Sequence, residues 1–121
     1  MEILPKQENL IKFLKSEHSG PVDMVNVLRF KPHKRLEYEK YAKAIGGFMK
    51  DFGMETIYSG DVFSTILGED EFFHHVIIMR YPSKEKFIEF SSSEKWQAIE
   101  HHRTKGLESQ WLLATKENSL A

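Results

Sequence analysis

The sequence predicts an α+β fold, in which a four-stranded antiparallel sheet carries helices on one of its faces. Three observations lead to this class. Four segments are rich in β-branched, aromatic and aliphatic residues, as strands are. Between them, apolar residues recur at spacings of three and four, as they do in amphipathic helices. Proline and glycine stand at the boundaries, and the resulting order is strand, helix, strand, strand, helix, strand.

The chain has 121 residues, enough for one core and too few for two independent domains. We expect a domain over 21–121, preceded by a helical extension over 1–20. A short stripe of leucine and isoleucine predicts about three turns of helix in this extension. The Ser-Gly-Pro sequence at 19–21 would end that helix.

The first strand is expected over 22–30, between two prolines, and the first helix of the domain over 38–52. Gly53 follows at the position where a helix often ends in a left-handed residue. A second strand is predicted over 54–67. Glycine inside a strand often marks a bulge, so we expect one at 59–60.

The last helix is expected in two pieces, the first of which covers 84–90 and begins at Ser83 as its N-cap. Ser91 and Glu94 have the spacing of a capping box, which predicts that the second piece begins there. Gly106 would stop it, and the segment LESQWLLAT would follow as the fourth strand. This complete order is that of the ferredoxin-like fold.

Both faces of the predicted sheet are apolar. The third strand, 72–81, and the first strand place apolar residues at consecutive positions, and consecutive residues of a strand point to opposite faces. The helices cover one face, and leaving the other in water would cost several kcal/mol at about 25 cal/mol per Å². We expect a second copy to pack sheet to sheet, which makes a homodimer; the alternative cover, the N-terminal helix, is too small.

Composition narrows the classes of function. The net charge is -1, with 17 basic and 18 acidic residues interleaved, so we expect no nucleic-acid partner. The chain has no cysteine, which excludes disulfides and thiolate metal sites. It also lacks an apolar run near the roughly 20 residues that span a bilayer, and it lacks a signal-peptide pattern. We therefore expect no membrane partner and a cytoplasmic protein.

Two pairs of neighbouring histidines stand out, but neither predicts a metal site. His74 and His75 lie in a strand and point to opposite faces, so at most one can line a pocket, and His75 is our candidate. His101 and His102 diverge around a helix, and no histidines stand three or four apart there, as zinc would require. We expect no metal and no cofactor.

Arg103 is the unexpected residue of the late helix, because it lies on the core-facing stripe, where a charge must be paired or must bind an anion. Two readings stay open. Arg103 could hold a carboxylate or enolate oxygen while His102 serves as acid or base, which makes both catalytic candidates. Alternatively, Arg103 pairs with an acid of a neighbouring element or subunit, and His102 supports it.

The remaining candidates would bind a ligand without reacting. Asn26 is a polar side chain in an apolar row of the first strand, so it either anchors the sheet or donates into a pocket. Several aromatic residues could line such a pocket or could simply belong to the core. They are Tyr41, Tyr58, Phe63, Trp96 and Trp111.

The runs YEKYAKAIGGFMKDFG, YSGDVF, TILGE, VIIMRYPSKEKFIEF and WQAIEHHRTKGLE, in this order over 22–116, resemble the domain-of-unknown-function 1330 family of the dimeric α/β-barrel superfamily. The resemblance implies a homodimer whose sheets form a barrel-like core, with a pocket between sheet and helices in each subunit. The superfamily includes cofactor-free monooxygenases, isomerases of small cyclic acids, haem-degrading enzymes and stress-induced proteins, and this branch has no generally assigned reaction.

Three functional hypotheses follow. The first is a small-molecule pocket protein, for example a cofactor-independent oxygenase or isomerase of a small acidic or enolisable compound. The second is a non-catalytic dimeric interaction or stress-related protein, in which the same charges stabilise the dimer. The third, haem binding or degradation, follows from an asparagine on the first strand and a tryptophan and histidine on a late helix.

Overall fold

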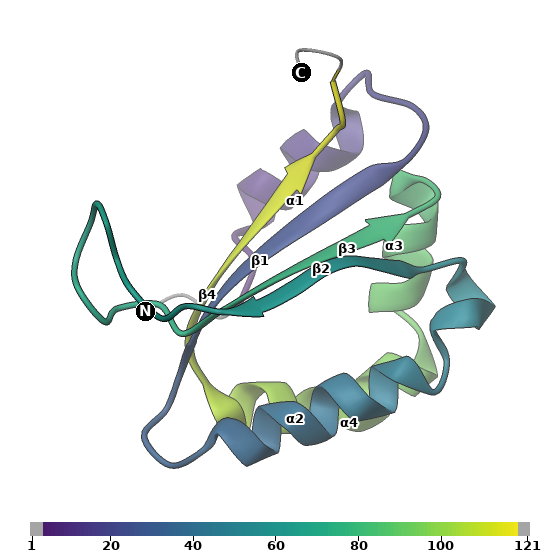
Figure 1. Ribbon diagram of the computed structural model, residues 1–121. Helices are drawn as coiled ribbons and strands as arrows, with labels where there is room; N and C mark the ends of the chain where they lie inside the picture. Colours follow the sequence, from purple (N-terminus) through teal and green to yellow (C-terminus); the bar gives the residue numbers. More distant parts are fainter. Residues whose placement is uncertain (1–3, 119–121) are drawn as a thin grey trace.

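The computed structural model describes residues 4–118 and confirms the α+β class. The sheet has the strand order β2-β3-β1-β4, and each neighbouring pair is antiparallel. Two helices lie side by side beneath it (Figure 1). The strands are β1 (Val22–Phe30), β2 (Glu55–Asp61), β3 (His75–Tyr81) and β4 (Leu107–Thr115). The helices are α1 (Gln7–Lys15), α2 (Arg35–Gly46), the 3-10 helix η1 (Met49–Phe52), α3 (Lys84–Ser91) and α4 (Glu94–Gly106).

The core lies between the sheet and the pair α2 and α4. Leu28 of β1 and Leu107 of β4 have no exposed surface, and Met24 is almost fully buried. Aromatic rings from both helices and from the end of β3 complete this layer, among them Tyr38, Tyr41, Tyr81 and Phe90.

The β2–β3 hairpin is shorter than expected. β2 ends at Asp61 rather than at 67, and β3 begins at His75 rather than at 72. The intervening loop, 62–74, contains apolar residues that are almost fully exposed, with Phe63 at 98% and Leu67 at 92%. Apolar composition alone suggested strand here, but ladder pairing ends where Asp61 faces His75.

The expected bulge lies elsewhere in β2. The register shifts between Thr56 and Tyr58, not at 59–60. Gly60 has a different role, since a Cβ atom there would lie 2.3 Å from the Tyr58 hydroxyl oxygen. The glycine therefore makes room for a neighbouring ring rather than for a bulge.

The helix boundaries also differ in detail. The segment expected as one helix over 38–52 is α2 followed by η1, and Gly53 ends it with the predicted left-handed backbone at φ 66°. Ser83 caps α3, accepting from the amide of residue 86 at 3.1 Å. The cap of α4 is Ser93, not Ser91: the Ser93 hydroxyl accepts from the Trp96 amide at 3.1 Å, while the Ser91 hydroxyl donates to the Ile88 carbonyl of α3.

The sheet face away from α2 and α4, which we call the open face, is apolar. Cross-strand register places Val25 opposite Ile78 and Val27 opposite both Val76 and Trp111. An ion pair crosses this face, with the Arg80 guanidinium donating to the Asp23 carboxylate at 2.7 and 2.9 Å. The complete open face consists of Val25, Val27, Tyr58, Val76, Ile78, Trp111 and Leu113 with this pair.

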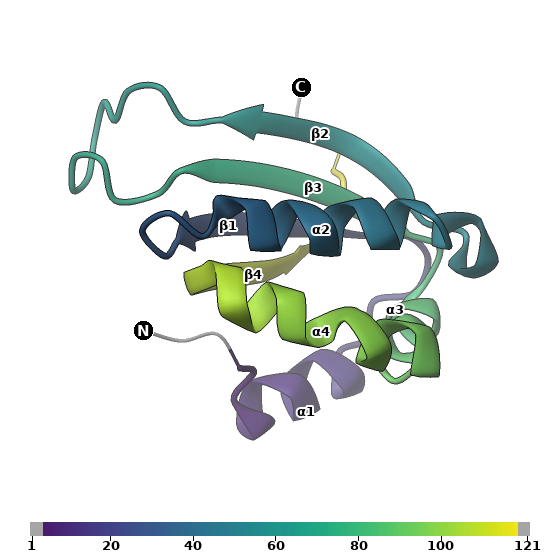
Figure 2. The ribbon, with the colours of Figure 1, turned by 90° about the horizontal axis from the view of Figure 1, so that it is seen from below.

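Helix α1 does not cover the open face. Viewed from below, it lies beyond β4 and next to α4, not across β1, β3 and β2 (Figure 2). Phe13 packs against Phe87 of α3 with ring centroids 5.7 Å apart, and the Lys84 ammonium donates to the Ser16 carbonyl at 2.5 Å. These contacts attach α1 to the helical side of the molecule, so its apolar stripe leaves the opposite side of the sheet bare.

Candidate functional site

Arg103 reaches from α4 into the layer between helices and sheet, as its position on the core-facing stripe predicted. Its Nη1 donates to the Gln110 side-chain oxygen of β4 at 2.9 Å, and its Nη2 donates to the Glu100 carboxylate, one turn earlier, at 3.0 Å. A carboxylate is therefore present beside Arg103, but it comes from the same helix rather than from another element.

Asn26 continues this network into the sheet. Its side-chain oxygen accepts from the Gln110 amide at 2.7 Å, while its own amide donates to the carbonyls of Met24 and Ile77 at 3.3 Å. We call Asn26, Glu100, Arg103 and Gln110 the interior polar cluster. It links α4 to three strands and fixes the orientation of both amide side chains.

One donor of the cluster is left over. Arg103 is 8% exposed, and its buried Nε has no hydrogen-bond partner among residues 4–118. Leaving a buried donor unpaired costs about 1–3 kcal/mol, and more when the group is charged. The guanidinium is thus paired at two nitrogens and unsatisfied at the third.

Aromatic side chains border the interior polar cluster. Trp96 donates its indole hydrogen to the Tyr41 hydroxyl at 2.8 Å, and the ring of Tyr41 lies 5.5 Å from that of Tyr38. Burial raises the pKa of the Tyr38, Tyr41 and Tyr81 phenols above their ordinary value; the Trp96 hydrogen bond and then the Arg103 charge oppose this at Tyr41, and the Arg103 charge opposes it at Tyr38. These phenols therefore stay neutral around physiological pH.

His102 does not point to the same place as Arg103. Its Nδ1 lies 2.9 Å from the Glu37 carboxylate of α2, and the ring is about a quarter exposed. This contact, and then Lys40, holds the pKa of the Glu37 carboxyl below its usual value. In this structure His102 joins α4 to α2 on the outer side, while Arg103 joins α4 to β4.

His75 takes part in a network that the sequence did not indicate. Its Nδ1 lies 2.7 Å from the Asp61 carboxylate and its Nε2 lies 3.2 Å from the Ser59 hydroxyl. Arg35 of α2 also donates to Asp61 at 2.7 Å, and it holds the pKa of that carboxyl below its usual value. Ser59, His75 and Asp61 are arranged as in a Ser-His-Asp catalytic triad. Ser59 and Asp61 are both exposed, however, so water and salt weaken their interactions with His75.

The other aromatic candidates lie away from the interior polar cluster. Tyr58 and Trp111 are on the open face, 56% and 58% exposed, and Phe63 is in the β2–β3 loop. Within the described part of the chain, no group of three or more His, Asp or Glu side chains could hold a metal ion. The same residues contain no helix of the length and apolarity that a membrane crossing demands.

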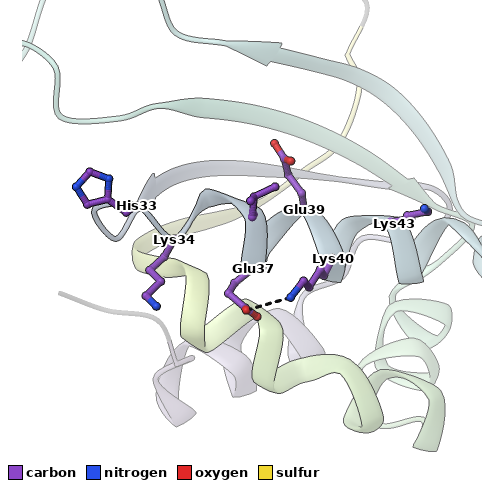
Figure 3. A pocket seen from close by; sticks show the side chains of 7 residues that line it. His33, Lys34, Glu37, Glu39, Lys40 and Lys43 are labelled. Carbon is purple, nitrogen blue, oxygen red and sulfur yellow. Dashed lines mark hydrogen bonds and ion pairs between the residues drawn. The ribbon is translucent and has the colours of Figure 1, made fainter.

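Two of the surface cavities lie near α2. The smaller, about 390 Å³, follows α2 and the loop before it over 33–43. Figure 3 shows its side chains spreading from α2 and from the loop before it, with Glu37 paired to Lys40 and Glu39 on another side, so its polar groups do not converge. The larger, about 560 Å³, lies where β1 ends and α2 begins, and Arg29, Arg35 and Asp61 are among its walls.

The fold and the interior polar cluster together define a ferredoxin-like α+β protein with polar groups held between sheet and helices. The chain belongs to the family described as Domain of unknown function (DUF1330), whose model matches residues 26–116, in agreement with the resemblance noted in the sequence. No curated protein matches the chain.

Three solved structures illustrate the similarity. A protein of unknown function from Rhodopseudomonas palustris is 23% identical with a TM-score of 0.90, over 98% of both chains. Hydroxynitrile lyase from Passiflora edulis is 14% identical with a TM-score of 0.66, over 84% of this chain and 96% of that one. A dimeric protein of unknown function from Bacteroides fragilis, with a ferredoxin-like fold, is 10% identical with a TM-score of 0.60, over 80% and 96%. At these identities the comparisons establish the fold.

Proposed function

We propose that this protein binds a small acidic compound between its sheet and the helices α2 and α4, with Arg103 as the group that holds the acid. The observation that carries the proposal is the buried, unpaired Nε of Arg103. An oxygen of a carboxylate or enolate supplies the acceptor that this nitrogen lacks, and a charge-assisted hydrogen bond is stronger than a neutral one.

The surroundings of Arg103 suit such a ligand. Asn26 holds Gln110 in place on the sheet side, and Tyr41 and Trp96 provide apolar surface with their polar ends already paired to each other. His102 is the acid or base in the catalytic version of this proposal, and it reaches the ligand by leaving Glu37. The hydroxynitrile lyase with the same fold supports a small-molecule site in this architecture.

We also propose that two copies pair through their open faces. Monomeric proteins rarely expose an apolar sheet face of this kind. Burying it between two copies would stabilise the dimer by about 25 cal/mol for each Å² of apolar surface. The β2–β3 loop adds further exposed apolar side chains, Phe63, Ile66 and Leu67. The Bacteroides fragilis protein with this fold is dimeric, which supports the proposal.

The binding proposal is tested by calorimetric titration of the purified protein with acetate, benzoate and malonate, each compared with its neutral amide. We expect at least one acid to bind and its amide to fail. Arg103→Gln should weaken the affinity roughly tenfold or more, as loss of a charged hydrogen bond does. The matched control is Lys43→Gln, which removes a positive charge from the surface of α2 and should bind normally.

The non-catalytic alternative also has a specific observation, since Glu100 and Gln110 already occupy two nitrogens of Arg103. If the wild-type protein binds none of the acids, and Arg103→Gln shifts the dimer toward monomer, the arginine is a structural residue and the ligand proposal is wrong. The haem hypothesis rests on Asn26, Trp96 and His102, whose side chains are hydrogen-bonded to Gln110, Tyr41 and Glu37 respectively. Addition of haemin without a Soret shift would exclude it.

A further inference from the structure

The larger cavity, which we call the end cavity, is separate from the interior polar cluster. It lies at the end of the sheet, between the last residues of β1, the start of α2 and the base of the β2–β3 loop, and it measures about 560 Å³. None of its lining residues belongs to the interior polar cluster. Its walls include Arg29, Phe30, Arg35, Asp61, His74 and Glu108.

The acidic side chains of the end cavity are already paired with basic side chains. Asp61 accepts from Arg35 at 2.7 Å and contacts His75 at the same distance. Glu108 accepts from the Nε of Arg29 at 2.9 Å. Both carboxylates therefore have cationic partners, and neither is left to attract a cation.

The basic side chains keep unused donors. The Nε and Nη1 of Arg29 donate to Glu108 and to loop carbonyls. The Nε and Nη2 of Arg35 donate to the carboxylates of Glu39 and Asp61. No hydrogen bond or ion pair within residues 4–118 uses Nη2 of Arg29 or Nη1 of Arg35. Lys31 donates to the Thr104 carbonyl at 3.2 Å with one of its three hydrogens.

His74 adds a neutral donor. Its Nδ1 accepts from the backbone amide of Phe30 at 3.0 Å, which leaves the ring hydrogen on Nε2, and no contact among the described residues uses that hydrogen. Burial, followed by the charges of Arg29 and Arg35, lowers the pKa of His74, so the ring stays neutral at pH 7. The Phe30 ring, which is 7% exposed, stacks on His74 with centroids 5.7 Å apart and has the Arg35 guanidinium 5.0 Å from its centre, so it forms a covered floor that orients both donors.

The backbone beside this floor is also unusual. His33, which lines the end cavity, has φ 62°, a left-handed conformation that non-glycine residues adopt uncommonly. Such conformations gather at ligand-binding sites, where the surrounding structure holds them in place. Together, the wall offers several free donors, satisfied acceptors and an aromatic floor.

We propose that the end cavity binds a small organic carboxylate, with the anion held by Arg29, Arg35 and His74. A carboxylate has only acceptors, and so complements a wall whose free groups are donors. This site is independent of the ligand proposed at Arg103.

The test is a titration of the full-length ¹⁵N-labelled protein with benzoate, and with benzamide as its neutral counterpart, at constant ionic strength. We expect benzoate to shift the backbone amide signals of 29–35 and of His74, and benzamide to leave them in place. Arg29→Gln and Arg35→Gln should each raise the dissociation constant roughly tenfold. Lys43→Met, which lies outside the cavity, is the control for lost surface charge.

Two further variants keep the result decisive. Lys31→Met breaks no ion pair, so it tests the cavity even if an arginine variant unfolds, and it should weaken benzoate roughly threefold. Arg103→Gln should leave the shifts at 29–35 unchanged. The proposal is overturned if benzamide causes the same shifts, if every folded cavity variant binds within about twofold of wild type, or if Arg103→Gln abolishes the shifts.

Discussion

Arg103 is the one charged side chain that is buried among residues 4–118. Its place on the core-facing stripe raised the question of whether it meets a ligand or a neighbouring acid. The structure shows an acid, Glu100, at one nitrogen, an amide at the second and nothing at the third. A buried ion pair of this kind contributes little by itself, but removing one partner leaves the other uncompensated.

We therefore expect Arg103→Met to lower the free energy of unfolding by about 2–3 kcal/mol, less than for a fully buried pair because Glu100 keeps some contact with water. Urea denaturation followed by circular dichroism measures this. The exposed control Lys43→Met should change stability by about 0.5 kcal/mol or less. Equal stability of the two variants would show that the interior polar cluster adds nothing to the fold.

His74 gives a prediction about pH. The pKa of His74 lies below its ordinary value of 6.5, through burial and then through Arg29 and Arg35, against the smaller effect of Glu108. The folded protein disfavours the charged form of the His74 ring. The contribution of neutral His74 to the free energy of unfolding is therefore complete above pH 6.5, and it is lost as the pH falls through the lower pKa of the folded state.

The measurement is an NMR titration of the His74 ring protons, together with unfolding curves between about pH 7 and pH 5. We expect a midpoint for His74 below 6.5, and a fall in stability on acidification that is smaller in His74→Gln. His101→Gln, on the exposed surface of α4, is the control and should keep the wild-type slope. A His74 midpoint above 6.5 would refute the assignment.

At the scale of elements, the close approach of α2 and α4 depends on Gly106. A Cβ atom there would lie 2.7 Å from the Tyr38 backbone nitrogen and 3.0 Å from its Cβ, whereas a Cβ at Gly46 meets nothing within 4 Å. Backbone at that distance cannot move aside easily. The sequence presented Gly106 only as a helix stop, and its packing role became visible through a residue 68 positions away.

We expect Gly106→Ala to destabilise the protein by about 1–3 kcal/mol, as overpacking does. Gly46→Ala changes the same residue type in the last position of α2 and should be neutral or stabilising by up to about 1 kcal/mol. Thermal unfolding of both variants compares them directly. Similar melting temperatures would mean that the two helices can separate slightly without cost.

Element boundaries show where local reasoning succeeds. Ser83 begins α3 and Gly53 ends η1, as predicted, because a helix cap depends on residues within one turn of it. The β2–β3 loop did not follow its apolar composition. Phe73 packs edge-on against Trp111 at 5.7 Å, and the Arg29 guanidinium lies 4.7 Å from the centre of the Phe72 ring, so both rings find partners without strand pairing.

At the scale of the whole molecule, no helix among residues 4–118 covers the open face. We expect the wild-type protein to sediment as a dimer at micromolar concentration. Ile78→Asp, at the centre of this face, should convert it to monomer, because an unpaired charge in an apolar interface is costly. Leu36→Asp, at a residue of α2 that is 71% exposed, should remain dimeric. A wild-type monomer would contradict the sheet-to-sheet pairing.

The sequence by itself determined the α+β class, the order of strands and helices, the family and the apolar character of both sheet faces. All of these follow from periodicity, caps and short motifs, which act between residues close in the chain. Only the tertiary structure decided which side chains meet. Arg35 and Asp61 are 26 residues apart, and Asn26 and Gln110 are 84 apart, so strand register and helix packing bring them together. Such contacts leave no local pattern, and for this reason the interior polar cluster and the end cavity became visible only in the folded chain.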